Sequence, residues 1–574
     1  MKRYLIPIAI LLLVTLALAA CGGSQPAATE APAEQPAATT APAEQPTQAP
    51  AAEPTKEEVK EEPTKAPEPT EPPKEEAKTT PKVLKIANTA NITTWDPIKS
   101  FSTEAAYMAN MYEQLLRINP PGADEKFTPL LAESWEKSDD GTVWTFHLRK
   151  GVKFHDGEPL TSEAVKMSIE AAADHGGASF IWAPLDTIET PDDYTAVFNL
   201  KYAAPLDLIA SSLYGAWIVS PKALKAAEEN PDYFEQGVEA GTGPYMLESY
   251  TPDQEVLFTK FDDYWGGWDD KKFDKVLVQI VPEAVTQQQM LEGGEVDLVT
   301  RIPQENYDTF RNNPDYEVIT EPSFFNYVGF FNTLRPPLDN VKVRQALSYA
   351  TPYQDIIDIG AKGLGTQSRG PVPKGVWPWS EEVKQYTTDM DKAKQLLADA
   401  GYPDGGFKLV LTYAAENATE EAFAPLLKDA WGELGVDVEL KPMLFNQQWE
   451  WAKSDPPNAQ DVFLLLYWPT YSDAGADNLW SMFHSSEKPF FNLSYWKNEK
   501  FDQLVDDAIA KTVTDPETAQ KEYIEAMNLL VDEAPGLFFF DTMAIFIIPN
   551  YIQGFQYNLN YPFVQYFFYD LYTE

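Results

Sequence analysis

The stretch that decides the fold is DDGTVWTFHLRKGVKFHDGEPLT, residues 139–161. Apolar and polar residues alternate over Val143–Leu148, a pattern that predicts a half-buried strand. The pairs Asp140-Gly141 and Asp156-Gly157 favour tight turns, so they bracket strands on both sides. Thr161 then offers a side-chain oxygen that can cap a following helix. The stretch therefore predicts strands and a helix in close succession.

The same alternation of strands and helices continues on both sides of this stretch. Strands are predicted over 194–200 and 254–260, and Ser162 is a second candidate cap for the helix near 163. Apolar residues recur at helical spacing in three places: 108–116, 393–400 (with Gly401 as a terminal cap) and 501–509. Residues 82–574 number 493, which is too many for one core, so an α/β chain of at least two lobes is expected.

The N-terminus carries a processing signal. Lys2 and Arg3 precede an apolar run, Tyr4–Ala20, which is short for a membrane span but suits the core of a signal peptide. The run ends in Leu18-Ala-Ala-Cys21, which resembles the bacterial lipobox, and Cys21 is the only cysteine in the chain. We therefore expect a signal peptide over 1–20 and lipid on Cys21, against the alternatives of an ordinary signal peptide or a membrane helix.

Residues 21–81 have the composition of a tether. They consist mainly of Ala, Pro, Glu, Thr and Gln, and the motif APAEQP occurs at 31–36 and again at 41–46. So few apolar residues cannot offset the entropy lost on folding, so disorder is expected. Roughly 60 residues of extended Pro-rich chain could reach about 180 Å. The segment is read as a spacer between a membrane and the folded part.

Composition excludes several functions. The formal charge of −44 would repel nucleic acid phosphates, so no nucleic acid partner is expected. No P-loop, G-x-S-x-G or H-E-x-x-H motif occurs, and the four histidines show no metal-ligand spacing. We therefore predict no enzyme, no cofactor and no metal. A surface hydrolase or an adhesin is kept as an alternative from another class.

Several segments, read in order, resemble the large solute-binding proteins of the peptide/nickel family of ABC importers. The resemblance covers essentially all of 82–574. Besides 139–161, the matching segments are Thr128–Trp135, Gly241–Tyr245, Tyr264–Gly266, Leu291–Asp297, Val343–Ala350, Ala393–Pro403 and Leu434–Glu439. So many matches in the same order are not expected by chance.

This resemblance implies a two-lobed α/β fold of the periplasmic-binding-protein kind, similar to type II, the "Venus flytrap", with an extra domain in the N-terminal half. The chain would cross to lobe II near Phe324–Asn332 and return near Phe540–Ile548. The implied boundaries are lobe I at 82–117, 216–325 and 541–574, the extra domain at 118–215, and lobe II at 326–540.

The implied function is reversible capture of a small ligand between the lobes and delivery to the permease subunits of an ABC transporter. The protein would be a monomer held by its N-terminal lipid on the outer face of the cytoplasmic membrane or in the periplasm. A peptide is the leading ligand, and an oligosaccharide or another uncharged solute is the alternative. Nickel is not expected, because no histidine lies in the cleft segment.

The resemblance also implies ligand contacts. Peptide binders place an Asp for the ligand amine in a segment that matches Tyr467–Asp473. Thr470 stands at that position, and Asp473 could replace it, face solvent or cap a helix. Dipeptide binders hold the ligand carboxylate with an Arg, where this chain has Glu416 and Asn417. Because both charged anchors are absent, the uncharged ligand stays open. The expected contacts are Tyr467, Trp468, Thr470, Tyr471, Asp473, Asn332 and Tyr112, the last with a core role as its alternative.

Overall fold

The first sheet, here called sheet I, has five strands in the order β11-β1-β10-β9-β8. The computed structural model describes residues 81–89, 92–468, 475–485 and 491–574. β1 is parallel to β10 and β11, whereas β9 is antiparallel to both of its neighbours, β8 and β10. The bounds are β1 Val83–Asn88, β8 Tyr245–Thr251, β9 Glu255–Lys260, β10 Lys275–Ile280 and β11 Leu298–Val299, with α5 Ala284–Glu292 and α6 Tyr307–Arg311 beside them.

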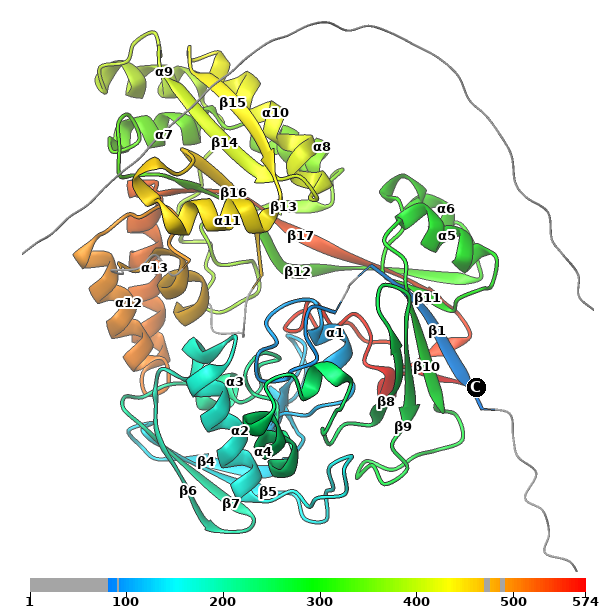
Figure 1. Cartoon of the computed structure of the whole chain (residues 1–574). Helices are drawn as coiled ribbons and strands as arrows, with labels where there is room; N and C mark the ends of the chain where they lie inside the picture. The colour runs from blue at the N-terminus through cyan, green and yellow to red at the C-terminus, as the bar shows by residue number, and fades with distance from the viewer. Residues whose placement is uncertain (1–80, 90–91, 469–474, 486–490) are drawn as a thin grey trace, which may run out of the picture. The chain divides into compact units, whose positions relative to one another are not determined.

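A second sheet, the N-terminal extra sheet, contains the stretch that opened the sequence argument. Its order is β4-β5-β7-β6, all antiparallel, and β5 is Val143–Leu148, the strand that the alternation predicts. Gly141 and Gly157 have φ of +71° and +87°, as tight turns require, and Thr161 caps α2. α2 packs on this sheet and α4 packs against α2 (Figure 1). The bounds are β4 Ala132–Lys137, β6 Leu185–Asp192, β7 Thr195–Leu200, α2 Ser162–His175, α3 Leu206–Ile209 and α4 Pro221–Glu229.

The third sheet, sheet II, has six strands in the order β13-β17-β12-β16-β14-β15, and an apolar core packs against each face of its central strands. In β16, Val462 and Leu464 face one apolar core, and Phe463, Leu465 and Tyr467 face the other. Burial on both sides explains the continuous apolar run of this strand. The bounds are β13 Gly365–Gln367, β14 Lys408–Ala414, β15 Asp437–Met443, β16 Val462–Tyr467, α7 Val341–Ala350, α8 Tyr353–Gly360, α9 Met390–Asp399, α10 Ala418–Gly432, α11 Phe445–Ser454, α12 Glu499–Lys511 and α13 Pro516–Glu533.

Two long strands extend from sheet II to sheet I. β12, Tyr316–Phe331, and β17, Gly536–Pro549, pair antiparallel from one end to the other. The pairing register shifts between Pro322 and Asn326, where a proline cannot donate to the ladder, and again after Tyr327. In Figure 1 both strands run to α5, α6 and β11. The crossings expected near 324–332 and 540–548 overlap these strands, and the domain boundaries themselves stay a prediction.

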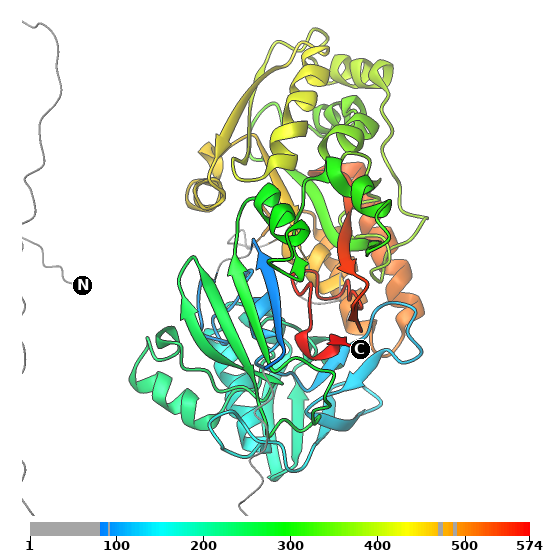
Figure 2. The ribbon, with the colours of Figure 1, turned by 90° about the vertical axis from the view of Figure 1, so that its right-hand side faces the viewer.

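The C-terminal segment packs back onto the core of sheet I. Tyr557, Tyr561, Tyr566 and Phe568 are all buried there. β18, Ile552–Gln553, pairs antiparallel with β19, Tyr572–Thr573, close to the C-terminus marked in Figure 2. The last segment of the chain therefore completes the core that its first strand begins.

One predicted helix is wrong over most of its length. Apolar spacing favours a helix through 108–116, but α1 is only Ala105–Met108, and β2, Leu116–Ile118, pairs with β3, Phe127–Pro129. The carbonyl oxygens of Asn110 and Met111 accept from the N–H groups of Tyr245 at 3.1 Å and Gly243 at 2.8 Å. Long-range backbone pairing thus replaces the helix. The other two predicted faces lie in α9 and α12, and Gly401 has φ of +92°.

Candidate functional site

A cavity of about 800 Å³, here called the cleft, lies beside the middle of the two long strands β12 and β17. One side, wall I, is formed by residues 300–307 after sheet I. The opposite side, wall II, is formed by residues 414–422 at the end of β14 and the start of α10. Ser323, Phe325 and Tyr327 of β12 and residues 542–546 of β17 line the space between the walls. A volume of this size suits a small solute of a few residues or rings.

A buried glutamine of α5 holds the start of wall I. The side-chain oxygen of Gln287 accepts from the N–H groups of Thr300 at 3.1 Å and Arg301 at 3.0 Å. Its Nε2 donates to the carbonyl oxygen of Val281 at 2.7 Å, and the side chain is fully buried. Two hydrogen bonds from the backbone that carries Arg301 thus end on Gln287, and a third holds Gln287 itself in place.

Wall II is positioned by a helix cap. The side-chain oxygen of Asn417 accepts from the N–H groups of Thr419 at 3.1 Å and Glu420 at 3.2 Å, which caps α10. The same oxygen accepts from the hydroxyl of Tyr327 at 3.1 Å. Because Tyr327 belongs to β12, this contact fastens a crossing strand to wall II.

Glu420 is a buried acid at the base of wall II. Its residue is 1% exposed, and burial raises the pKa of its carboxyl to about 7, although backbone hydrogen bonds from Ala414 and Leu466 oppose the rise. Oε2 accepts from the N–H of Ala414 at 2.8 Å, and Oε1 accepts from Nδ2 of Asn417 at 3.2 Å. Both oxygens therefore have protein partners, and the group is close to its titration point at neutral pH.

Charged side chains lie on both walls of the cleft. Lys362, which follows α8, forms an ion pair at 2.9 Å with Glu305 of wall I. Oε1 of Glu416, on wall II, accepts from the N–H of Phe445 at 2.9 Å. Arg301 is exposed toward the cleft from wall I. The ion pair joins wall I to the segment that follows α8, and the other two charges remain in reach of a solute.

A smaller aromatic cavity adjoins the cleft. Its volume is about 490 Å³, and it shares Phe445, Leu465 and Trp468 with the cleft. Phe101 and Trp449 add further rings to its lining. Flat aromatic faces suit apolar or ring-shaped parts of a solute. The two cavities together offer one polar and one aromatic compartment.

The structure brings two of the predicted contact residues to these cavities. Trp468 lines both, with its ring edge-on to Phe563 at 5.8 Å between centroids. Tyr467 lines the aromatic cavity, and its hydroxyl donates to Oδ1 of Asp477 at 2.8 Å. The other predicted contacts in this segment, Thr470, Tyr471 and Asp473, lie outside the described residues, as does Cys21.

Asn332 and Tyr112 are placed elsewhere. Nδ2 of Asn332 donates to the carbonyl oxygen of Pro456 at 2.9 Å, and Asn332 lines neither cavity. Tyr112 is 1% exposed in the core of sheet I, where its hydroxyl accepts from the N–H of Ala240 at 3.3 Å. Tyr112 thus has the contacts of a core residue, the alternative given for it above.

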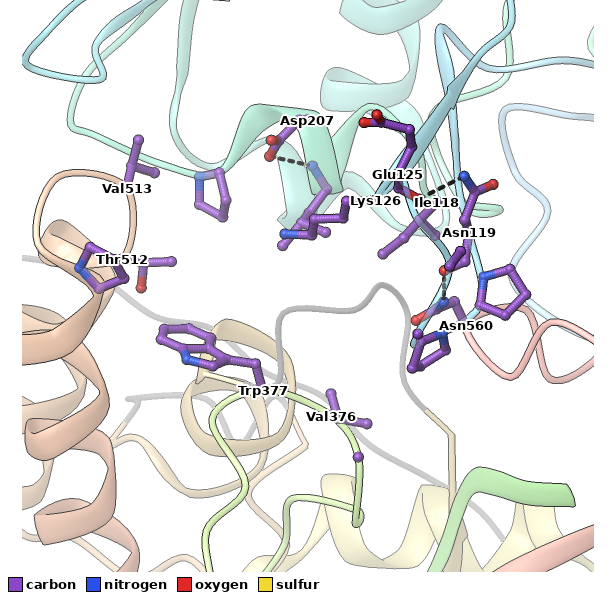
Figure 3. Close-up of a pocket in the computed structure, with 18 of the residues that line it drawn as sticks. Ile118, Asn119, Glu125, Lys126, Asp207, Val376, Trp377, Thr512, Val513 and Asn560 are labelled. Atoms are coloured by element: carbon purple, nitrogen blue, oxygen red, sulfur yellow. Dashed lines mark hydrogen bonds between the residues drawn. The ribbon is translucent and has the colours of Figure 1, made fainter.

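A third cavity, of about 650 Å³, lies between the loop of residues 118–126 and the loops around Trp377 and Val513 (Figure 3). Nδ2 of Asn560 donates to the carbonyl oxygen of Asn119 at 2.8 Å there. Of the residues of β12 and β17, only Phe324 lines this cavity. None of the predicted contact residues lines it. We therefore take the cleft as the candidate site.

Reasoning from sequence missed Arg301, Tyr327 and Glu420 as cleft residues. They come from three segments far apart in the chain, and no local motif marks them. The one available signal was the resemblance at Glu416 and Asn417, which line the cleft just after β14. The resemblance therefore drew attention to the segment after β14 but not to the residues that face it across the cleft.

No group of three or more His, Cys, Asp or Glu among the described residues could hold a metal ion. None of the described helices combines the length and apolar character needed to cross a bilayer.

Comparisons with known proteins agree on one family. A family model described as bacterial extracellular solute-binding proteins, family 5 middle, matches residues 126–490. The chain is 30% identical over 457 residues to heme-binding protein A of Haemophilus influenzae, which covers 74% of this chain and 81% of that protein. It is 28% identical over 456 residues to the probable D,D-dipeptide-binding periplasmic protein of Escherichia coli, covering 78% and 86%.

Solved structures share the fold. A periplasmic binding protein of Helicobacter pylori in complex with the peptide STSA superposes with a TM-score of 0.73 at 24% identity, covering 86% of this chain and 98% of the other. An ABC transporter substrate-binding protein of Listeria monocytogenes gives 0.75 at 24% identity, covering 86% and 100%. At this identity the likeness establishes the two-lobed α/β fold.

Proposed function

Because the chain belongs to the family 5 bacterial extracellular solute-binding proteins, we propose that it captures a small peptide in its cleft and delivers it to an ABC permease. The relatives named above bind heme or D,D-dipeptides, and a structural neighbour holds a tetrapeptide. The single observation that carries the proposal is the cavity of about 800 Å³ between two walls that the long strands connect.

The two strands supply a means of closure. β12 and β17 are continuous across the molecule, and their pairing is irregular between Pro322 and Asn326 and after Tyr327. Irregular pairing leaves fewer ladder hydrogen bonds to resist bending, so rotation of the lobes is expected to occur there. A ligand that touches both walls would then favour the closed form by its extra contacts in that form.

Charge favours a peptide over an uncharged oligosaccharide. Arg301 and Glu416 lie on opposite walls of the cleft. A neutral solute held between the walls would offer neither of these opposite charges a charged partner when closure removes water, which is costly. A peptide with free termini supplies one group of each sign. The aromatic cavity next to the cleft would accept an apolar side chain.

The protein is proposed to reach the membrane through lipid on Cys21, with residues 22–81 as the spacer. The support is the lone cysteine after an apolar leader. The intact mass of the mature chain tests this directly: diacylated Cys21 as the first residue is the expected result, and a mature chain that keeps residues 1–20 would contradict it.

Native mass spectrometry tests the binding function. The mature chain, purified without denaturant, is mixed with a pool of short peptides and separately with a pool of neutral oligosaccharides. Adducts from the peptide pool alone are expected. Adducts from the oligosaccharide pool alone would transfer the proposal to that ligand class, and hydrolysed products without adducts would favour an enzyme.

A further inference from the structure

Arg301 differs from the other arginines in the part of the chain that the structure describes. Each of the others places its guanidinium on a carboxylate or a carbonyl oxygen; these are Arg117, Arg149, Arg311, Arg335, Arg344 and Arg369. Among the described residues, the guanidinium of Arg301 has no such partner. The chain holds 88 acidic and 44 basic side chains, so a cation without an acid beside it is unexpected.

The position of Arg301 is nevertheless well defined. Gln287 accepts from the N–H groups of Thr300 and Arg301, and β11 pairs Val299 with Ala87 of β1 just before them. This arrangement aims an exposed cation into the cleft from a rigid base. Binding groups held by packed elements recognise a ligand group with less loss of entropy than mobile ones.

The charge of Arg301 acts on the space between the walls. Burial raises the pKa values of Tyr307 and Tyr327, and the positive charge of Arg301 opposes the rise at both phenols. The hydroxyl of Tyr327 donates to Asn417 of wall II. Arg301, Tyr307 and Tyr327 all line the cleft, so the charge of Arg301 acts in the space that a solute between the walls would occupy.

The other charges of the cleft already have partners. Lys362 is paired with Glu305. Glu420 is buried and accepts hydrogen bonds from Ala414 and Asn417. Among the cations that line the cleft, Arg301 is thus the one left to bind an anion from outside the protein.

We propose that Arg301 binds a carboxylate of the transported solute through a two-pronged guanidinium–carboxylate contact. The inference rests on the proposed function and specifies the chemistry of its site: the solute carries a free carboxylate, as a peptide does at its C-terminus. The planar fork of arginine matches a carboxylate with two parallel hydrogen bonds. Closure strengthens this contact because water leaves the cleft.

Paired ligand pools test the assignment. Wild-type protein is titrated with a pool of tripeptides and tetrapeptides bearing free C-termini and with the same pool bearing C-terminal amides, and affinity is measured by competition in native mass spectrometry. The free-acid pool is expected to bind on the order of tenfold or more tightly. Arg301→Gln is expected to bind both pools as weakly as wild type binds amides, and Arg301→Lys to keep part of the preference.

Arg311→Gln is the matched control. Arg311 lies ten residues further on, pairs with Asp308 at 3.0 Å and does not line the cleft, so its loss changes net charge equally but should leave the preference intact. If Arg301→Gln keeps the wild-type preference, the assignment is wrong. Equal binding of both pools by wild type would also overturn it while leaving the peptide function in place. Binding of neither pool would overturn both.

Discussion

Glu420 makes the stability of the empty protein depend on pH. Its ordinary pKa is 4.5, and burial raises the folded value to about 7. The folded state therefore holds the proton more tightly than the unfolded state. The resulting stability is fully present below pH 4.5 and is lost as pH rises toward 7. A shift of about 2.5 units at about 1.36 kcal/mol each gives roughly 3 kcal/mol.

Glu420→Gln replaces the acid by a neutral side chain of the same shape. The variant cannot take part in this titration, so its melting temperature relative to wild type should rise between pH 5 and pH 8. For a lobe of this size, about 3 kcal/mol corresponds to roughly 6–12 °C. Scanning calorimetry without ligand measures this difference in melting temperature at each pH. The exposed neighbour provides the control, since Glu421→Gln should follow wild type at every pH. If the melting temperatures of Glu420→Gln and wild type change in parallel between pH 5 and pH 8, the reasoning is refuted.

Two further variants test the packing around Gly243, beside sheet I. Gly243→Ala would place a Cβ 2.6 Å from the backbone carbon of Met111, so chemical denaturation should show a loss on the order of 2–3 kcal/mol. Gly432→Ala, with nothing within 4 Å of the added Cβ, should show no such loss. His155 is the second: burial lowers the pKa of its ring, but Glu239 and a backbone carbonyl outweigh this and the net pKa is raised above 6.5. The stability from this pair is present below pH 6.5 and lost as pH rises through the folded value, so His155→Gln should lower the melting temperature more at pH 6 than at pH 9.

Local chemistry predicted the local elements well. The turn glycines at 141 and 157 and the strand Val143–Leu148 are where the sequence pattern puts them. These features depend on residues that are neighbours in the chain. The helix predicted over 108–116 failed because its carbonyl groups pair with the backbone near Gly243, which no local pattern records.

The candidate site was predicted less well for a related reason. Trp468 and the segment after β14, which the resemblance singled out, line the cavities, and their role in binding stays a prediction. The importance of Arg301, however, comes from the wall that faces it across the cleft, and that of Glu420 comes from its burial. A sequence read alone gives neither the distance between segments nor the exposure of a side chain, so these two residues looked like ordinary surface charges.

Hydrogen exchange of backbone amides tests the central claim, that the solute sits between the two walls and draws them together. With a peptide identified in the pool experiment at saturation, exchange should slow in residues 300–307 and 414–420 at once, because closure buries both. Slower exchange on one wall only, or a change confined to the cavity around Trp377, would contradict the account.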